Sequence, residues 1–119
     1  MLFSGVLSRR PGINCSGLGA VNGAIEALTR TLALELGPDI RVNCLSPSMV
    51  RSEAYDALDE ERREAMYENT GQSLPVGRVG MPSEIAQAVI STLTNGYHTG
   101  QIIDVDGGHM IRQYATRQS

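Results

Sequence analysis

Apolar and polar positions along the chain repeat with two different periods, one typical of strands and one typical of helices. From Leu18 to Leu36 apolar residues recur every three or four positions, which predicts an amphipathic helix that ends at Gly37-Pro38. The turn-rich segment SRRPGINCSG precedes this helix. Short apolar strands are predicted over Met1–Ser4, Ile40–Ser46 and Gln101–Asp106.

Two further helices are predicted between the second and third strands. Residues Glu53–Glu68 form a helix-prone stretch with seven acidic residues against two arginines, which is typical of a surface helix, and a loop follows from Leu74 to Gly80. In Pro82–Thr94, Pro82 suits the first turn and Glu84 the positive end of the helix dipole. This alternation of strands and helices favours parallel strands joined by right-handed crossovers.

The length and composition favour one folded domain. Hydrophobic residues make up 41% of the 119 positions and charged residues 19%, whereas disordered chains combine few apolar residues with high net charge. The net charge of -3 gives no electrostatic reason to expect nucleic acid or a membrane surface as a partner. All ten basic residues are arginines, so no mechanism can draw on a lysine ammonium from this chain.

Cysteine spacing and hydropathy argue against further classes of protein. Cys15 and Cys44 are isolated, without CxxC or Cys/His spacing, so neither a zinc site nor a redox pair is predicted. No segment reaches the roughly 18 to 20 apolar residues of a membrane span, and the first residues lack a basic leader and a cleavage pattern. We therefore expect a soluble, cytoplasmic protein with reduced thiols.

Three motifs cover most of residues 18 to 108: GAIEALTRTLALELGPDIRVNCLSPSMV, GRVGMPSEIAQAV and TGQIIDVDGG. In this order and at ordinary spacing, they resemble the later segments of the short-chain dehydrogenase/reductases. Three ordered motifs are a far more specific signal than one. The resemblance implies an α/β fold, namely the C-terminal part of a Rossmann-type doubly wound parallel sheet. It also implies a single partial domain over residues 1–119, with the N-terminal nucleotide-binding half absent.

The resemblance implies NAD or NADP as cofactor, and a catalytic Tyr four residues before a Lys on the long helix. In the family the phenol transfers the proton, while the Lys lowers the pKa of the phenol and holds the nicotinamide ribose. Counting back from ALTRTLALEL places Leu18 at the Tyr position and Asn22 at the Lys position. Leu18 has no proton to transfer, and Asn22 can hydrogen-bond a ribose hydroxyl but carries no charge. Because the family's glycine-rich, pyrophosphate-binding turn is also absent, very weak dinucleotide binding is expected of this chain alone.

Two more segments correspond to family site residues. The family places a Ser at the end of the strand before the long helix, where it polarises the substrate carbonyl. Ser4 is the candidate, one residue further from position 18 than the usual spacing, and the alternative is a plain strand-end hydroxyl. The loop SPSMVRS corresponds to the family loop at the nicotinamide end of the cofactor, with a Ser in place of a Gly, and the alternative is an ordinary β-to-α turn. The candidate cofactor-contacting residues of this loop are Pro47, Ser48, Val50 and Ser52.

The remaining titratable residues have simpler interpretations. His98 and His109 are conceivable substitute acids, but ordinary surface or turn histidines are favoured, and the tail from His109 is expected to be less ordered. Asp104 and Asp106 lack a third ligand, so capping or turn hydrogen bonds are favoured over a metal site. The acidic run over residues 59–64 is a solvated helix face or, by the resemblance, part of a substrate cover.

Three hypotheses for function follow. The first is a fragment or truncated reading of a short-chain dehydrogenase/reductase-like enzyme that binds NAD(P) in its full-length form and acts on a small carbonyl or alcohol. Met1 falls inside a predicted strand, which favours it. The second is a non-catalytic homologue that serves as a binding or oligomerisation module, and the third is a divergent enzyme whose proton donor lies in the missing half. A homo-oligomer is expected through the helix over residues 18–36, because family members commonly pair this helix.

Overall fold

Three parallel strands form the centre of the protein in a computed structural model that describes residues 1–112. The strand order is β1-β2-β3, and each predicted strand is present in shortened form. Leu2 pairs with Cys44, and Cys44 pairs in turn with Ile102. The strands are β1 (Leu2–Phe3), β2 (Cys44–Pro47) and β3 (Ile102–Val105).

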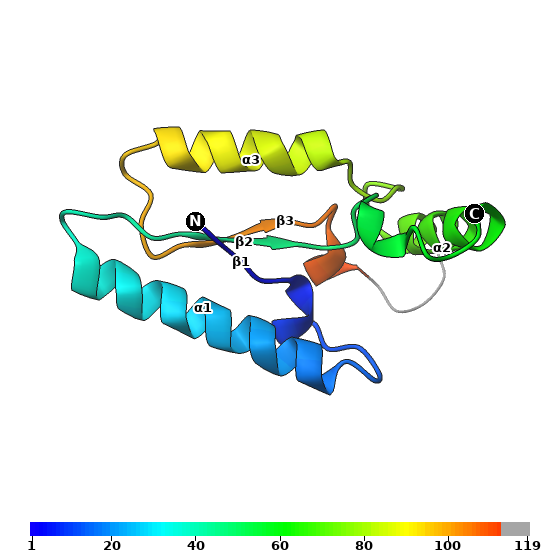
Figure 1. Ribbon diagram of the computed structural model, residues 1–119, viewed down its shortest axis with the longest axis horizontal. Coiled ribbons are helices and arrows are strands. Elements are labelled where there is room, and N and C mark those ends of the chain that lie inside the picture. The colour runs from blue at the N-terminus through cyan, green and yellow to red at the C-terminus, as the bar shows by residue number, and fades with distance from the viewer. Residues whose placement is uncertain (113–119) are drawn as a thin grey trace.

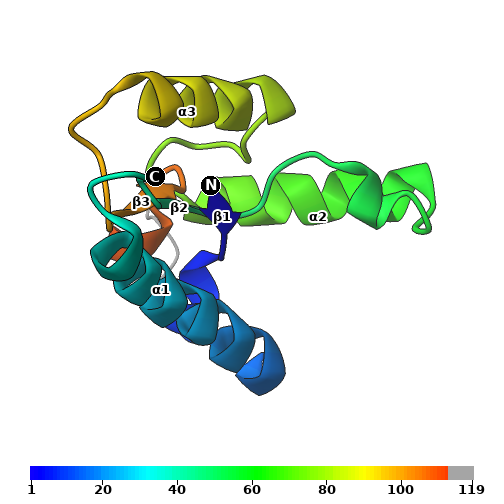
Figure 2. The same cartoon turned by 60° about the vertical axis from the view of Figure 1, so that its left-hand side comes forward.

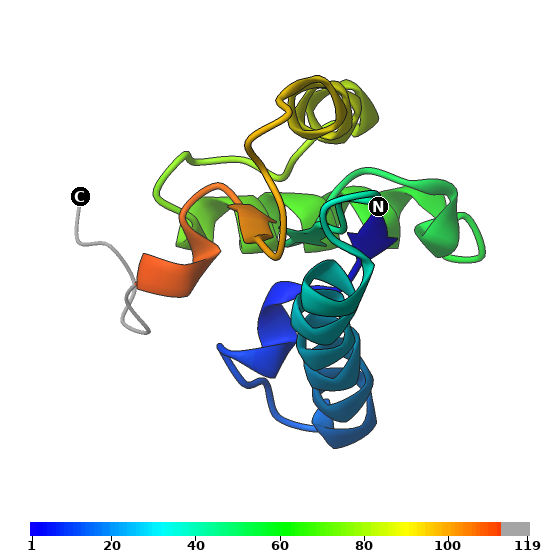
Figure 3. The same cartoon turned by 90° about the vertical axis from the view of Figure 1, so that its left-hand side faces the viewer.

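Helices cover both faces of this sheet, which confirms the predicted α/β class. Helix α1 (Ser16–Leu36) packs on one face and α3 (Pro82–Thr94) on the other, as Figures 1 and 3 show. Helix α2 (Glu60–Ser73) lies beyond the carboxyl ends of the strands and projects away from the sheet (Figures 1 and 2). No helix within residues 1–112 is long and apolar enough to cross a membrane. Short 3-10 helices are η1 (Val6–Ser8), η2 (Glu53–Tyr55) and η3 (His109–Ile111).

The central strand β2 carries the core. Cys44, Leu45 and Ser46 have no solvent exposure, because they are covered by a strand on either side and a helix on either face. Within the described residues, β1 is hydrogen-bonded to a neighbouring strand on one side only. Its other edge therefore offers unpaired backbone groups, as an edge strand does.

The face of α1 that meets the sheet is more polar than its apolar stripe suggests. Its buried residues are Asn22, Glu26, Thr29 and Ala33, whereas Val21 and Leu28 are 58% and 48% exposed. The apolar pattern predicts which residues form the helix, but not which face of the helix packs against the sheet. Polar residues are tolerated there because several find hydrogen-bond partners, as Thr29 does by donating to the Ile25 carbonyl at 2.8 Å.

Two predictions were wrong, one about the acidic helix and one about the C-terminal segment. The single helix over Glu53–Glu68 is divided, because Asp59 caps α2 by accepting a hydrogen bond from the backbone N–H of Arg62 at 2.8 Å. Helix α2 then continues to Ser73. The chain from His109 is also not loose at its start, since it forms η3 and His109 is buried. The rest of that predicted tail, residues 113–119, lies outside the described residues.

Candidate functional site

The carboxyl ends of β1 and β2 meet the first half of α1 at Gly5. A β-carbon built on Gly5 would lie 2.9 Å from Asn22 Nδ2 and 3.7 Å from the carbonyl oxygen of Pro47. These distances show that the loop after β1, the end of β2 and the sheet-facing side of α1 lie close together at Gly5. Ligands of open α/β sheets bind at this edge, outside the carboxyl ends of the strands.

Asn22 is the polar side chain that α1 brings to this edge. The residue is 8% exposed, and its amide nitrogen lies beside Gly5. An amide can both donate and accept hydrogen bonds, so it can bind a polar group of a ligand at this edge. Leu18 lies one helical turn earlier and is 55% exposed. Neither residue offers a titratable proton.

Ser4 is held at the end of β1, but Gly5 is the residue that faces Asn22. The backbone N–H of Ser4 donates to the Leu45 carbonyl at 2.8 Å. Its hydroxyl is buried and has no hydrogen-bond partner among residues 1–112. The usual family spacing, counted back from position 18, reaches position 5 rather than position 4. The role of Ser4 in polarising a substrate carbonyl remains a prediction.

The loop Pro47–Ser52 is fixed at several points. Pro47 still belongs to β2, and Ser48 Oγ lies 2.8 Å from His109 Nδ1. Val50 forms an isolated parallel bridge with Gly80, whose N–H donates to the Met49 carbonyl at 3.0 Å. The Ser52 hydroxyl accepts the N–H of Ala54 and caps η2. The contacts with Gly80 and His109 join segments distant in sequence, so no local pattern could have predicted them.

Helix α2 is tied to the same loop through Arg51. The guanidinium donates to both carboxylate oxygens of Glu64 at 2.7 and 2.8 Å and stacks 4.5 Å from the centre of the Tyr67 ring. This hydrogen-bonded pairing holds the pKa of Glu64 below its usual value. Part of the acidic helix is thus anchored rather than freely solvated. An open groove of about 680 Å³ lies between α2 and the start of α3.

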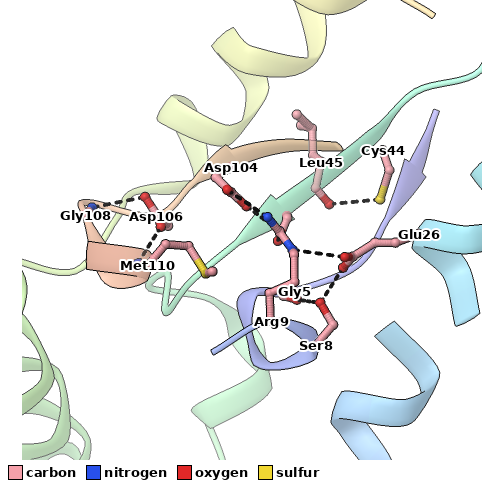
Figure 4. Close-up of polar contacts among 11 residues, drawn as sticks. Gly5, Ser8, Arg9, Glu26, Cys44, Leu45, Asp104, Asp106, Gly108 and Met110 are labelled. Carbon is pink, nitrogen blue, oxygen red and sulfur yellow. Dashed lines mark hydrogen bonds and ion pairs between the residues drawn. The ribbon is translucent and has the colours of Figure 1, made fainter. Parts of the chain in front are cut away.

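A polar network joins α1, η1, β2 and β3 around Arg9 (Figure 4). Its guanidinium donates to Glu26 at 3.0 Å, to Ser46 Oγ at 2.9 Å and to Asp104 at 3.0 Å. Ser8 Oγ donates to the other oxygen of Glu26 at 2.6 Å. The hydrogen bond to Asp104 raises the pKa of Arg9 further above its already high value. The network leaves the buried Glu26 carboxylate fully paired, which assigns it a structural role.

The two acidic residues of β3 differ in role. Asp104 pairs with Arg9, whereas the Asp106 carboxylate accepts the backbone N–H groups of Gly108 and Met110, each at 3.0 Å. The capping and turn interpretation is confirmed for Asp106. Residues 1–112 contain no group of three or more acidic, histidine or cysteine side chains arranged to hold a metal ion.

The two histidines also differ. His98 is partly exposed, and its backbone carbonyl accepts hydrogen bonds from Arg41 and Asn43 at 2.9 and 2.8 Å. His109 is 6% exposed and contacts Ser48. It is therefore a turn histidine but not a surface one. Sequence reasoning missed its partner because the two residues lie 61 positions apart.

Known proteins match this chain over nearly its whole length. The family described as enoyl-(acyl carrier protein) reductase matches residues 2–110. A short-chain dehydrogenase/reductase, ATR9, of Stachybotrys chlorohalonatus is 35% identical over 92% of this chain and 42% of its own length. A galactitol 2-dehydrogenase (L-tagatose-forming) of Cereibacter sphaeroides is 39% identical over 92% of this chain and 43% of its own. A solved small-chain dehydrogenase in complex with NADPH superposes with a TM-score of 0.87 and 49% identity, over 92% of this chain and 49% of that one.

A parallel sheet covered by helices on both faces is the architecture of the Rossmann-type class of α/β proteins. Within that class, the chain belongs to the short-chain dehydrogenase/reductase family. It spans less than half the length of the relatives that it matches.

Proposed function

We propose that this chain supplies the C-terminal part of an NAD(P)-dependent oxidoreductase that, in its full-length form, acts on a small carbonyl or alcohol. The observation that carries the proposal is the position of the Asn22 side chain, whose residue is 8% exposed. It lies beside Gly5 and the end of β2, at the edge where this class of fold binds ligands. A ribose hydroxyl suits an amide, because each group can both donate and accept a hydrogen bond.

The described residues fit the nicotinamide end of such a cofactor. A bound nicotinamide supplies or accepts a hydride. Asn22 holds the ribose, while Pro47, Ser48, Val50 and Ser52 line the nicotinamide end. The sequence has no glycine-rich turn for the pyrophosphate. We propose that residues 1–119 form only part of the domain, and that dinucleotide binding therefore needs the other half.

A non-catalytic role is the second candidate, and the chemistry around α1 favours it. A carbonyl that accepts a hydride also needs a proton, which the family takes from the Tyr position. By the resemblance Leu18 stands there, and it has no proton to transfer. A protein with these residues can bind a cofactor without turning it over, and thus serve as a binding or oligomerisation module.

Cofactor titration followed by assays for hydride transfer separates the two candidates. We would express the longest product of the reading frame, titrate NADH and NADPH by fluorescence, and assay a panel of small carbonyls. Enzyme function predicts both binding and turnover, whereas the module predicts binding without turnover. The variant Asn22→Leu should weaken binding about fivefold through loss of the amide. Absence of cofactor binding by the longest product would refute the proposed function.

The exposed side of α1 supports a proposed homo-oligomer contact over residues 18–36. Val21 and Leu28 are each about half exposed and lie off the buried row of Asn22, Glu26, Thr29 and Ala33. Burying apolar surface of this kind is favourable at about 25 cal/mol per Å². Light scattering should detect a dimer or larger assembly, and the double variant Val21→Glu, Leu28→Glu should lower its mass to that of one chain.

A further inference from the structure

One side-chain contact connects the turn after β3 to the loop after β2. Ser48 Oγ and His109 Nδ1 lie 2.8 Å apart. Because β2 and β3 are parallel neighbours, the segments that follow them emerge at the same edge of the sheet. The C-terminal turn therefore touches the loop that is proposed to line the nicotinamide end of the cofactor.

Burial of the His109 imidazole carries a free-energy cost that an apolar side chain at this position would not carry. The residue is 6% exposed, and its Nε2 is buried without a hydrogen-bond partner among residues 1–112. A buried, unsatisfied nitrogen costs free energy, whereas an apolar side chain of similar size carries no such cost. The Ser48 contact is the interaction that distinguishes this imidazole from an apolar side chain.

The charges around His109 favour its neutral form. Burial lowers the pKa of the imidazole below 6.5, the nearby Arg112 and Arg10 guanidiniums lower it further, and Asp106 acts in the opposite direction. A neutral imidazole has one donor and one acceptor nitrogen. If the Ser48 hydroxyl donates to Nδ1, then Nε2 carries the proton, and in the other tautomer Nδ1 donates to Ser48.

The turn that carries His109 is firmly held. The Asp106 carboxylate accepts two backbone N–H groups within it, and Arg10 donates to the Met110 carbonyl at 3.1 Å. Gly108 has a φ of 90° and packs so closely that a β-carbon would lie 2.5 Å from Pro75. A well-supported histidine can therefore set the position of the loop that it contacts.

We propose that His109 is a positioning residue that acts through Ser48 and holds the loop Pro47–Ser52 in place for a ligand with nicotinamide and ribose groups. This inference rests on the proposed function. Protonation adds a third positive charge near Arg10 and Arg112 in a buried place, so the turn must loosen to hydrate it. Ligand affinity consequently falls as the pH drops below the range in which the imidazole is neutral.

Calorimetric titration of the longest product of the reading frame with NAD+ and with NADP+ at about pH 8 and about pH 5.5 tests this role, since histidine changes charge between these values. The variants are Ser48→Ala, His109→Leu and His109→Asn, with His98→Asn as the control for histidine loss elsewhere. We expect Ser48→Ala and His109→Leu to lose about fivefold in affinity at the higher pH, as for one lost hydrogen bond. Both should also show a flatter pH response than the wild type. His109→Asn should recover most of the affinity, because its amide can still reach Ser48.

Nitrogen NMR of the imidazole ring gives a readout independent of binding. The sequence contains two histidines, so His98→Asn leaves His109 as the one ring signal. We expect it to titrate below 6.5 and to shift in the added Ser48→Ala variant. The proposal is overturned if a cofactor binds but His109→Leu matches the wild type in affinity and pH profile. If neither cofactor binds the wild type or any variant, the proposed function itself fails, and this inference fails with it.

Discussion

The side-chain amide of Asn22 occupies the space that a side chain at position 5 would need. A β-carbon on Gly5 would lie 2.9 Å from Asn22 Nδ2, closer than β-carbons approach other atoms in proteins. Gly5 has a φ of -170°, which any residue can adopt, so the restriction comes from Asn22 and not from the backbone. Positions 5 and 22 are thus sterically coupled in this chain.

Gly5→Ala should therefore destabilise the protein by about 1 kcal/mol, the lower end of the cost of overpacking, because the Asn22 amide is the end of a side chain that can turn away. The same change in an Asn22→Ala background should cost little, because the obstructing amide is gone. Urea denaturation of the two single variants and the double variant would measure the coupling. Additive effects of the two substitutions would contradict the steric explanation.

Removal of Arg9 should be much more damaging than removal of an exposed arginine. Arg9→Met leaves Glu26 buried with Ser8 as its remaining partner, and loss of one member of a buried ion pair costs about 3 kcal/mol. Arg62 forms an exposed ion pair with Asp59 at 3.6 Å, so Arg62→Gln should cost less than about 0.5 kcal/mol. Chemical denaturation of both variants gives the comparison. Equal losses of stability would show that the Arg9 network is not a structural one.

Two helical glycines should respond to alanine in opposite directions. A β-carbon on Gly71 would lie 2.9 Å from Arg78 Cα, a backbone atom that cannot easily move, so Gly71→Ala should cost about 2 kcal/mol. A β-carbon on Gly17 meets nothing within 4 Å, and Gly17→Ala should stabilise by about 0.5 to 1 kcal/mol. Thermal denaturation of the two variants measures both effects. Stabilisation by Gly71→Ala would show that α2 does not pack closely against Arg78.

Glu84 should remain ionised well below pH 4.5. Its hydrogen bonds from the Arg78 side chain and the Met81 backbone lower its pKa from 4.5 to about 2. Because the folded value is the lower one, the stabilisation is complete above the unfolded value of 4.5 and disappears as the pH falls through about 2. Carboxyl NMR titration measures this directly. The pKa should return toward 4.5 in Arg78→Gln, and a wild-type value near 4.5 would show that the pairing does not persist in solution.

The sequence by itself determined the order of elements and the family. The apolar periodicity of a strand or helix and the residues that end it are local features of the sequence. Helix α3 was therefore predicted with its observed ends, Pro82 and Thr94. The motifs around β2 and β3 carried the resemblance, which the comparisons confirm. Local capping was less visible: Asp59 divides the predicted acidic helix because a side-chain hydrogen bond outweighs weak helix propensity there.

Only the tertiary structure decided which residues meet at the carboxyl edge of the sheet. Gly5 lies against Asn22, and Ser48 against His109, across separations that no local period encodes. The same holds for α1, whose buried row contains Asn22 and Glu26 rather than its most apolar side chains. Burial of these polar groups depends on partners such as Arg9, which only the folded chain brings within hydrogen-bonding distance.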